Sequence, residues 1–349
     1  MVMGLLNAML AGAAAPLHRC ALEDWPVENY HAYVFHHGSL DPADQELVDV
    51  LASAPPKLGV YLLVSTVDTT KEMDSAVEAL WNAQTNTEPP WLVVMSPRRE
   101  ATNTMVWSTA LRTPSVGAIL GSPARSRIAE SLLEGDSAVW LLVECGDTVR
   151  DEAAVDLLSG ELKRFEKEVR APKAGPSNQF KSGLSLLPHF SLVRVTRSDS
   201  AEEFLLTTLL AAEDALQRPI AFPIFGRGRV LPSLTGRHLN EEAIGRHCRL
   251  LLGDCTNEIR DVTQGSELLL GAHWNSVIEK PGPASPTPSA AVKMTPTVEA
   301  FNSTSTNAVP ETPSSTLPGP GSSGSFAAAL ILAAVVGFAL MKVWRPRQP

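Results

Sequence analysis

The stretch YVFHHGSLDPADQELVDVL (33–51) sets the pattern from which this fold can be worked out. It opens as an apolar and aromatic run, passes a Gly-Ser turn, and continues as a helix with Asp41 as its cap and Pro42 in its first turn. Two further stretches repeat this order, WLLVECGDTVRDEAAVDLL (140–158) and LVRVTRSDSAEEFLLTTLL (192–210). Repeated strand–turn–helix units predict an α/β fold in layers.

Working outward from this pattern, six short apolar runs are predicted to be strands covered on both faces, because each is nearly continuous in apolar character. They cover residues 32–37, 58–67, 90–96, 137–145, 190–196 and 219–225. Helical patterns are predicted over 41–53, 148–169 and 198–216.

A second internal similarity pairs SPARSRIAESLLEGDS (122–137) with LNEEAIGRHCRLLLGDC (239–255), since both fit a helix that ends at Gly-Asp. Two tandem copies of one α/β module would explain both similarities. The polar, Pro/Gly/Ser-bearing stretch 171–183 is the predicted boundary, which gives module 1 over 25–170 and module 2 over 184–278.

The order strand, turn, helix, strand and then a proline-led strand resembles the thioredoxin-like fold. The step Pro89-Pro90-Trp91 is similar to that family's cis-proline at the start of a central strand. The resemblance covers 28–140 and, more loosely, 185–275, and it implies two tandem thioredoxin-like modules. The whole chain also resembles uncharacterised, membrane-anchored bacterial proteins.

The chain departs from that family at the position of its CxxC motif. Residues 37–41 read His-Gly-Ser-Leu-Asp and residues 196–199 read Thr-Arg-Ser-Asp, both without cysteine, and Cys145-Gly146-Asp147 holds a single thiol. A dithiol exchange cycle needs a second thiol to resolve the mixed disulfide. The usual redox activity of the family is therefore not expected.

The C-terminal part predicts a membrane anchor. Residues 326–344 form an apolar run, about 28 Å long at helical rise, which is enough for one transmembrane helix. The basic tail 345–349, together with Lys342, favours a cytoplasmic C-terminus. Residues 279–324 are rich in Pro, Ser and Thr and predict a disordered linker that holds the folded part off the membrane.

Residues 1–22 are apolar and rich in small residues, which is typical of a signal peptide with an exit near 13–15 or near Ala21. An apolar first helix or a misplaced start codon are the alternatives. A cytoplasmic tail supports the leader, because the soluble domain of a single-pass protein then lies outside the cytoplasm. Without a leader, the chain would be tail-anchored with its domain in the cytoplasm.

Charge and cysteine content exclude several classes of function. A net charge of -9 argues against nucleic acid as a partner, because phosphate binding needs a basic face. The four cysteines include no zinc-type pairing, and adjacent histidines in a strand, such as His36 and His37, point to opposite faces. No GxSxG element is present for a hydrolase. We expect no metal and no cofactor.

Three candidate sites remain. Cys145 ends a predicted strand just before a helix, whose N-terminus could activate its thiol, although a small buried residue is the alternative. Arg227 and Arg229 lie in the basic glycine loop 225–229 and could bind an anion, or could be exposed in a turn. Cys248 and Cys255 are too far apart on a continuous helix to pair, but Gly253 could let the chain fold back for a structural disulfide.

The leading hypothesis is a membrane-tethered, non-catalytic module that binds a partner protein of the cell envelope. The tether favours this function, because it raises the effective concentration at which the domain meets a partner. A redox enzyme that uses Cys145 alone, and a small-molecule or anion binder that uses the 225–229 loop, are the alternatives.

Overall fold

The computed structural model describes residues 15–85, 87–97, 104–168, 182–184, 187–210, 217–256 and 267–278. These residues belong to the first of two compact units, residues 1–286, and the second unit, 287–349, lies outside them. The predicted linker, transmembrane helix and basic tail therefore lie outside the described residues. Within the described part, no helix is long and apolar enough to cross a membrane.

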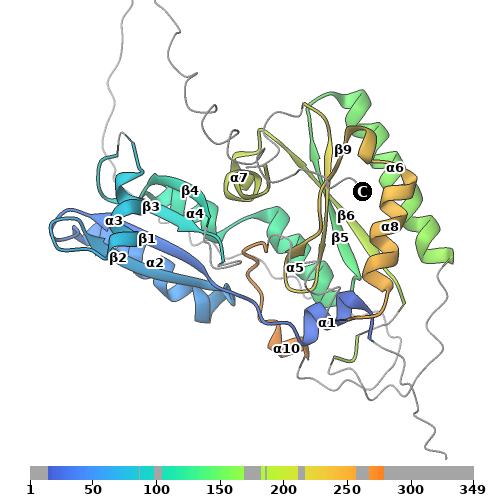
Figure 1. The fold of residues 1–349 in the computed structure, drawn as a ribbon, viewed down its shortest axis with the longest axis horizontal. Coiled ribbons are helices and arrows are strands. Elements are labelled where there is room, and N and C mark those ends of the chain that lie inside the picture. Colours follow the sequence, from blue (N-terminus) through green and yellow to red (C-terminus); the bar gives the residue numbers. More distant parts are fainter. Residues whose placement is uncertain are drawn as a thin grey trace, which may run out of the picture. The chain divides into compact units, whose positions relative to one another are not determined.

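The described part is a mixed α/β structure with two sheets, as the strand–turn–helix pattern predicted (Figure 1). The first sheet has the order β2-β1-β3-β4. β1 and β2 are parallel, β3 is antiparallel to β1, and β4 is antiparallel to β3. Its strands are β1 (Tyr30–His36), β2 (Leu62–Asp68), β3 (Trp91–Met95) and β4 (Met105–Ala110).

The second sheet repeats this arrangement. Its order is β6-β5-β7-β8, β5 and β6 are parallel, β7 is antiparallel to β5, β8 is antiparallel to β7, and the short β9 also pairs with β7. Its strands are β5 (Ala138–Glu144), β6 (Phe190–Thr196), β7 (Ile220–Phe225), β8 (Arg229–Val230) and β9 (Leu234–Thr235). Both sheets therefore have the same strand order and the same directions.

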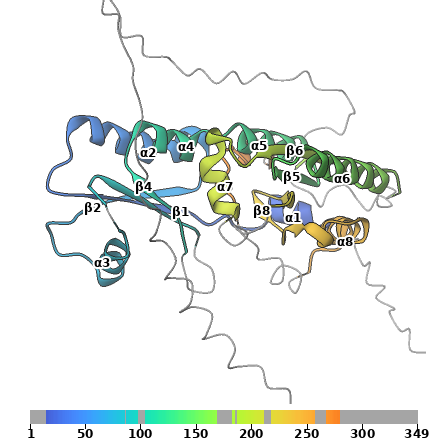
Figure 2. The ribbon, with the colours of Figure 1, turned by 90° about the horizontal axis from the view of Figure 1, so that it is seen from above.

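Helices cover the two sheets unequally. Helices α2 (Pro42–Leu58) and α4 (Thr113–Leu120) lie on one side of the first sheet, and the short α3 (Ser75–Asn82) lies on the other (Figure 2). Asp41 caps α2 by accepting the N–H of Asp44, as its sequence predicted.

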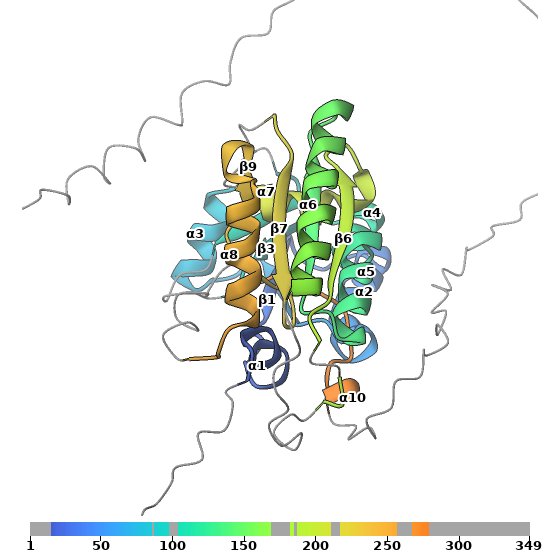
Figure 3. The ribbon, with the colours of Figure 1, turned by 90° about the vertical axis from the view of Figure 1, so that its right-hand side faces the viewer.

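The second sheet is covered on both sides. Helices α6 (Thr148–Glu168) and α8 (Glu241–Leu252) lie side by side on one face (Figure 3), and α5 (Pro123–Glu134) and α7 (Glu203–Leu210) pack on the other. The remaining helices are short: α1 (Leu17–Glu23), η2 (Ser200–Glu202), η3 (Gly236–His238) and α10 (Asn275–Ile278).

The central strand β5 shows why its sequence is apolar throughout. Trp140 and Leu142 point into the core under α6 and α8, whereas Val139, Leu141 and Val143 point into the core under α5 and α7. Side chains alternate between the two faces of a strand, so a strand between two helix layers needs apolar residues at every position. The prediction of a strand covered on both faces is confirmed here.

A junction of buried side chains joins the two sheets. The ring of Phe204, from α7, packs edge-on against Tyr30 in β1 and Trp107 in β4, with centroids 6.3 Å and 5.6 Å away. The Arg125 guanidinium lies over the same ring at 5.2 Å. Phe204 therefore belongs in sequence to the helices of the second sheet but in packing to the core of the first.

The predicted boundary at 171–183 falls within the second sheet, because β5 and α6 precede it and β5 pairs with β6 across it. Parallel strands need a long crossover connection, and the polar stretch belongs to the connection between α6 and β6. Its composition marks a loop, but loop composition does not say which strands pair. The chain passes from the first sheet to the second between β4 and β5 instead.

Residues 15–22 of the predicted leader are part of the fold. Helix α1 is buried along its whole length, and Leu17 packs with the core under α6 and α8. Pro16 forms a bridge with Asp254. Cleavage of a leader after residue 22 would remove Leu17 and most of α1 from the core. A leader that extends to residue 22 is therefore inconsistent with this packing. Residues 1–14 lie outside the described residues.

Burial of α1 predicts that the chain loses stability in mild acid. Nδ1 of His18 lies 2.9 Å from the Leu251 carbonyl oxygen, and burial lowers the pKa of His18 from 6.5 to about 4. Between these values the unfolded state binds a proton that the folded state does not, so stability falls as pH falls. The shift corresponds to about 3 kcal/mol lost between pH 7 and pH 4.

Urea unfolding at several pH values measures this loss. The His18→Gln variant should show a shallower decline toward pH 4 than the wild type, whereas a variant of the exposed His273, His273→Gln, should follow the wild type. Equal pH dependence in wild type and His18→Gln would contradict the prediction.

Candidate functional site

One face of the first sheet lacks the long helices that cover the other, and we call it the outer face: the side opposite α2 and α4. The register places side chains from all four strands in rows across it. One row is Leu63, His31, Met95 and Met105, the next is Ser65, Tyr33, Val93 and Ser108, and the last is Val67, Phe35, Trp91 and Ala110. Most of these side chains are apolar or aromatic.

The outer face is only partly covered. Helix α3 has no buried residue, and its Trp81 ring lies 5.0 Å from Phe35, at one end of the face. Toward the other end, Leu63 is 53% exposed and Met105 is 44% exposed. On the central strands, Phe35 and Val93 are fully buried, so the exposed apolar area lies at the two edges. The expectation that both faces of the strands are covered therefore holds at Phe35 and Val93 but is wrong at Leu63, on the edge strand β2.

Aromatic side chains on this face are held in fixed positions. The rings of His31 and Tyr33 stack with centroids 4.0 Å apart. Nε2 of His31 lies 2.8 Å from the Ser65 hydroxyl, and the Trp91 indole donates to Ser108 at 2.8 Å. Partial burial lowers the pKa of His31, so this ring is neutral near pH 7. The outer face thus presents an ordered and uncharged surface.

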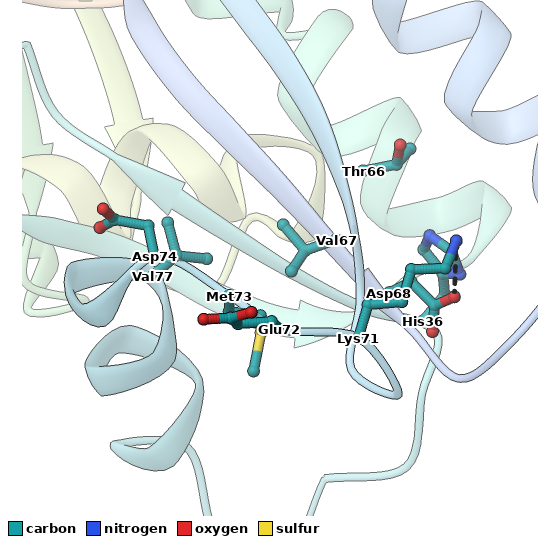
Figure 4. Close-up of a pocket in the computed structure, with 9 residues that line it drawn as sticks. All are labelled: His36, Thr66, Val67, Asp68, Lys71, Glu72, Met73, Asp74 and Val77. Atoms are coloured by element: carbon teal, nitrogen blue, oxygen red, sulfur yellow. Dashed lines mark ion pairs between the residues drawn. The ribbon is translucent and has the colours of Figure 1, made fainter.

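A pocket of about 450 Å³ adjoins the outer face at Val67, where β1 and β2 end (Figure 4). Acidic side chains dominate the charged part of its lining: Asp68, Glu72 and Asp74, beside Lys71. Its other lining residues are His36, Thr66, Met73 and Val77.

Asp68 organises this pocket. Its Oδ1 accepts the N–H groups of Gly38 and Thr70, both at 3.0 Å, and the Thr70 hydroxyl at 2.8 Å, and Lys71 lies 3.3 Å from Oδ2. These donors hold the pKa of Asp68 well below its usual range, with the Thr70 hydroxyl contributing most. Asp68, the last residue of β2, therefore holds the turn that follows and is ionised near neutral pH.

Cys145 lies at the end of β5, as predicted, and is half-buried. Its surroundings are anionic: Asp151 accepts the N–H of Cys145 at 2.8 Å and that of Gly146 at 2.9 Å, and Asp147 accepts the N–H of Val149. Two carboxylates at the start of α6 offset the positive end of the helix. Asp147 also pairs with Arg150 at 3.2 Å, and a reactive Cys145 stays a prediction.

The two arginines of the 225–229 loop are engaged by the protein itself. Arg227 donates to the Leu22 carbonyl at 2.7 Å, and Arg229 pairs with Glu267 at 2.9 Å with its guanidinium 4.8 Å from the centre of the Trp25 ring. These contacts fasten the N-terminal segment and give both arginines a structural role. The structure does not bring them together around an open anion site.

Cys248 and Cys255, the predicted pair, lie in different surroundings. Cys248 is fully buried in α8, and burial raises its pKa to about 12. Cys255 follows the helix and donates its N–H to Ala15 at 2.8 Å. All four cysteines are free thiols, and a Cys248–Cys255 disulfide stays a prediction. No group of three or more metal-binding side chains occurs among the described residues, which include His31, His36 and His37.

Sequence reasoning missed the outer face because its signal is spread over four strands. The alternation of His31, Tyr33 and Phe35 along β1 was the only local sign, and β4 and α3 were not predicted. Comparison of the sequence with protein-family models and with curated proteins gives no match.

Proposed function

We propose that this chain is a membrane-tethered, non-catalytic protein-interaction module of the cell envelope, and that a partner protein binds to the outer face. The observation that carries the proposal is the ordered, uncharged and half-exposed group of aromatic and apolar side chains around Leu63, Tyr33 and Met105. Aromatic residues and methionine are enriched in the buried centres of interfaces, because they bury much area at low entropic cost.

The chemistry of the pocket rim indicates what kind of partner fits. Glu72 and Asp74 add negative charge to the border of the outer face, next to Asp68. A partner that offers apolar side chains flanked by Lys or Arg would match both the face and its border. The net charge of -9 also favours a positively charged partner, because it attracts such a partner over long range.

A thioredoxin-like assignment of both sheet units is part of this proposal. It is supported by the strand order and strand directions that the two sheets share. The β–α turns after β1 and β5 do not hold a pair of cysteines, which supports binding over dithiol exchange. Replacing Cys145 with serine should therefore leave partner binding unchanged.

A photo-crosslinking residue at position 63 tests the proposal in intact cells. We expect it to give one discrete crosslinked protein, and the same residue at position 149, where Val149 is 80% exposed but isolated on α6, to give none. Leu63→Lys should weaken binding of the captured partner by more than tenfold, because a charge would be buried in the interface. Equal crosslinking from both positions would contradict it.

The Leu63→Lys variant also separates binding from folding. Leu63 is exposed on an edge strand, so the free energy of unfolding should change by no more than about 0.5 kcal/mol. If Leu63→Lys lost its fold as well as its binding, the loss of binding could not be assigned to the outer face. The Met105→Lys variant, on the opposite edge strand, would then provide the second measurement.

The tether and the export of the domain are proposed with the function. Protease treatment of intact cells, with one tag after Ser39 and another after Pro349, should digest the first tag and spare the second. Because α1 completes the core, cleavage of a leader is expected before Ala15 and not after Ala21. Protection of both tags would place the domain in the cytoplasm and overturn the envelope location.

A further inference from the structure

The segment before α1 pairs with the segment after α8, although most of the folded unit lies between them in sequence. Leu17 donates its N–H to the Gly253 carbonyl at 2.9 Å, and Cys255 donates to the Ala15 carbonyl at 2.8 Å. Pro16 and Asp254 form an antiparallel bridge between these two hydrogen bonds. The backbone therefore fixes residues 15–17 against 253–255.

This pairing brings two thiols together. Sγ of Cys20 lies 4.0 Å from the same Ala15 oxygen that accepts the Cys255 N–H at 2.8 Å, so the two cysteines meet at one backbone carbonyl. Both pack against the core under α6 and α8. Cys248 lies in a different environment: the charged groups near its thiol, such as Glu161 and Arg249, belong to α6 and α8.

We propose that Cys20 and Cys255 form a disulfide that fastens α1 to the segment after α8. The oxidant is a disulfide compound, such as an oxidised dithiol protein or oxidised glutathione. Cys255 is the more exposed of the two thiols, so its sulfur attacks the oxidant and expels one thiol. The sulfur of Cys20 then attacks Sγ of Cys255 and expels the second thiol. Two protein thiols lose two electrons and two protons, and the oxidant gains both.

The bond would close a loop from residue 20 to residue 255 that contains both sheets. Cross-linking so long a loop restricts the unfolded chain strongly, and the midpoint of thermal unfolding should rise on the order of 10 °C. Such a bond persists only in an oxidising compartment. The inference rests on the packing of α1 and is independent of what binds the outer face.

Mass spectrometry of the purified full-length chain tests the pairing. After equilibration with oxidised glutathione and alkylation of the remaining thiols, we expect the peptides containing Cys20 and Cys255 to be linked, and Cys145 and Cys248 to be alkylated. The rise in the unfolding midpoint should disappear on reduction. It should also be absent from Cys20→Ser and Cys255→Ser but present in Cys248→Ser, the matched control.

Linked peptides from Cys248 and Cys255 would overturn the proposal in favour of the pairing predicted from sequence. Alkylation or glutathionylation of all four cysteines, without a linked pair, would also overturn it. The comparison of oxidised with reduced wild type requires no substitution, so the result stands even where a serine variant of the buried Cys20 fails to fold.

Discussion

Replacing Arg125 with methionine is expected to lower the free energy of unfolding by about 3–5 kcal/mol. The buried guanidinium donates to the Leu269 carbonyl at 2.8 Å and to those of Ala118 and Ile119 at 2.8 Å and 2.7 Å. Methionine has a similar length but no donor, so three carbonyl oxygens, two of them in buried contacts, would lose their hydrogen bonds from this side chain.

Electrostatics adds to this loss. Burial lowers the pKa of Arg125 to about 10, and the negative charge of Glu202 opposes that shift. Glu202 is itself buried and accepts the Ala124 N–H at 2.7 Å and the Ser122 hydroxyl. Without the arginine, its charge would stay buried without the nearby cation that stabilises it. Urea unfolding of the full-length chain, followed by far-UV circular dichroism, measures the total effect.

Two controls identify the cause. Arg246→Met removes an exposed ion pair with Glu242 and should cost less than about 0.5 kcal/mol. The double variant Arg125→Met/Glu202→Gln separates the two contributions at the buried site. Recovery of most of the stability would assign the loss to the uncompensated carboxylate, and no recovery would assign it to the carbonyl hydrogen bonds. A loss below 1 kcal/mol in Arg125→Met alone would contradict the prediction.

Strands β5 and β7 of the second sheet could be predicted from the sequence because they are almost wholly buried, whereas the short β8 and β9 were not predicted. Every position of β5 before Glu144 is buried, so its composition alone identifies a doubly covered strand. The boundaries of helices α5 and α8 were also predictable, since Gly135 and Gly253 follow their last residues. Gly135 has a φ of 108°, a conformation that glycine adopts without strain.

The outer face could not be predicted in the same way, because it depends on register. Leu63 and Met105 lie at opposite edges of the sheet and share a row only through the pairing of β1 with β2 and with β3, and of β3 with β4. A shift of one residue in any pairing would turn the side chains to the other face. Register follows from the packed structure, whereas composition indicates only that a strand is present.

Strand pairing, which composition does not reveal, also explains why the predicted module boundary falls within the second sheet. Pro, Gly and Ser between residues 171 and 183 indicate a loop, and the chain offers no local sign that the strands on either side of it are neighbours. The pairing of β5 with β6 is decided by the core under α6 and α8, where Trp140 and Phe190 pack in one cluster. Loop composition therefore locates connections well and sheet boundaries poorly.

Phe204→Ala is expected to cost about 3–5 kcal/mol, and its effect should be concentrated in the first sheet. The ring is fully buried between Tyr30, Trp107 and Arg125, so alanine would leave a cavity at the junction of the two sheets. Phe204→Leu retains most of the buried volume and should cost clearly less. Hydrogen exchange measured by mass spectrometry should show faster exchange in β1 and β4 than in β5, because the buried centre of the second sheet does not include this ring. An equal increase in both sheets would mean instead that they unfold as one cooperative unit, and the outer face around Leu63 would then share the stability of the whole fold.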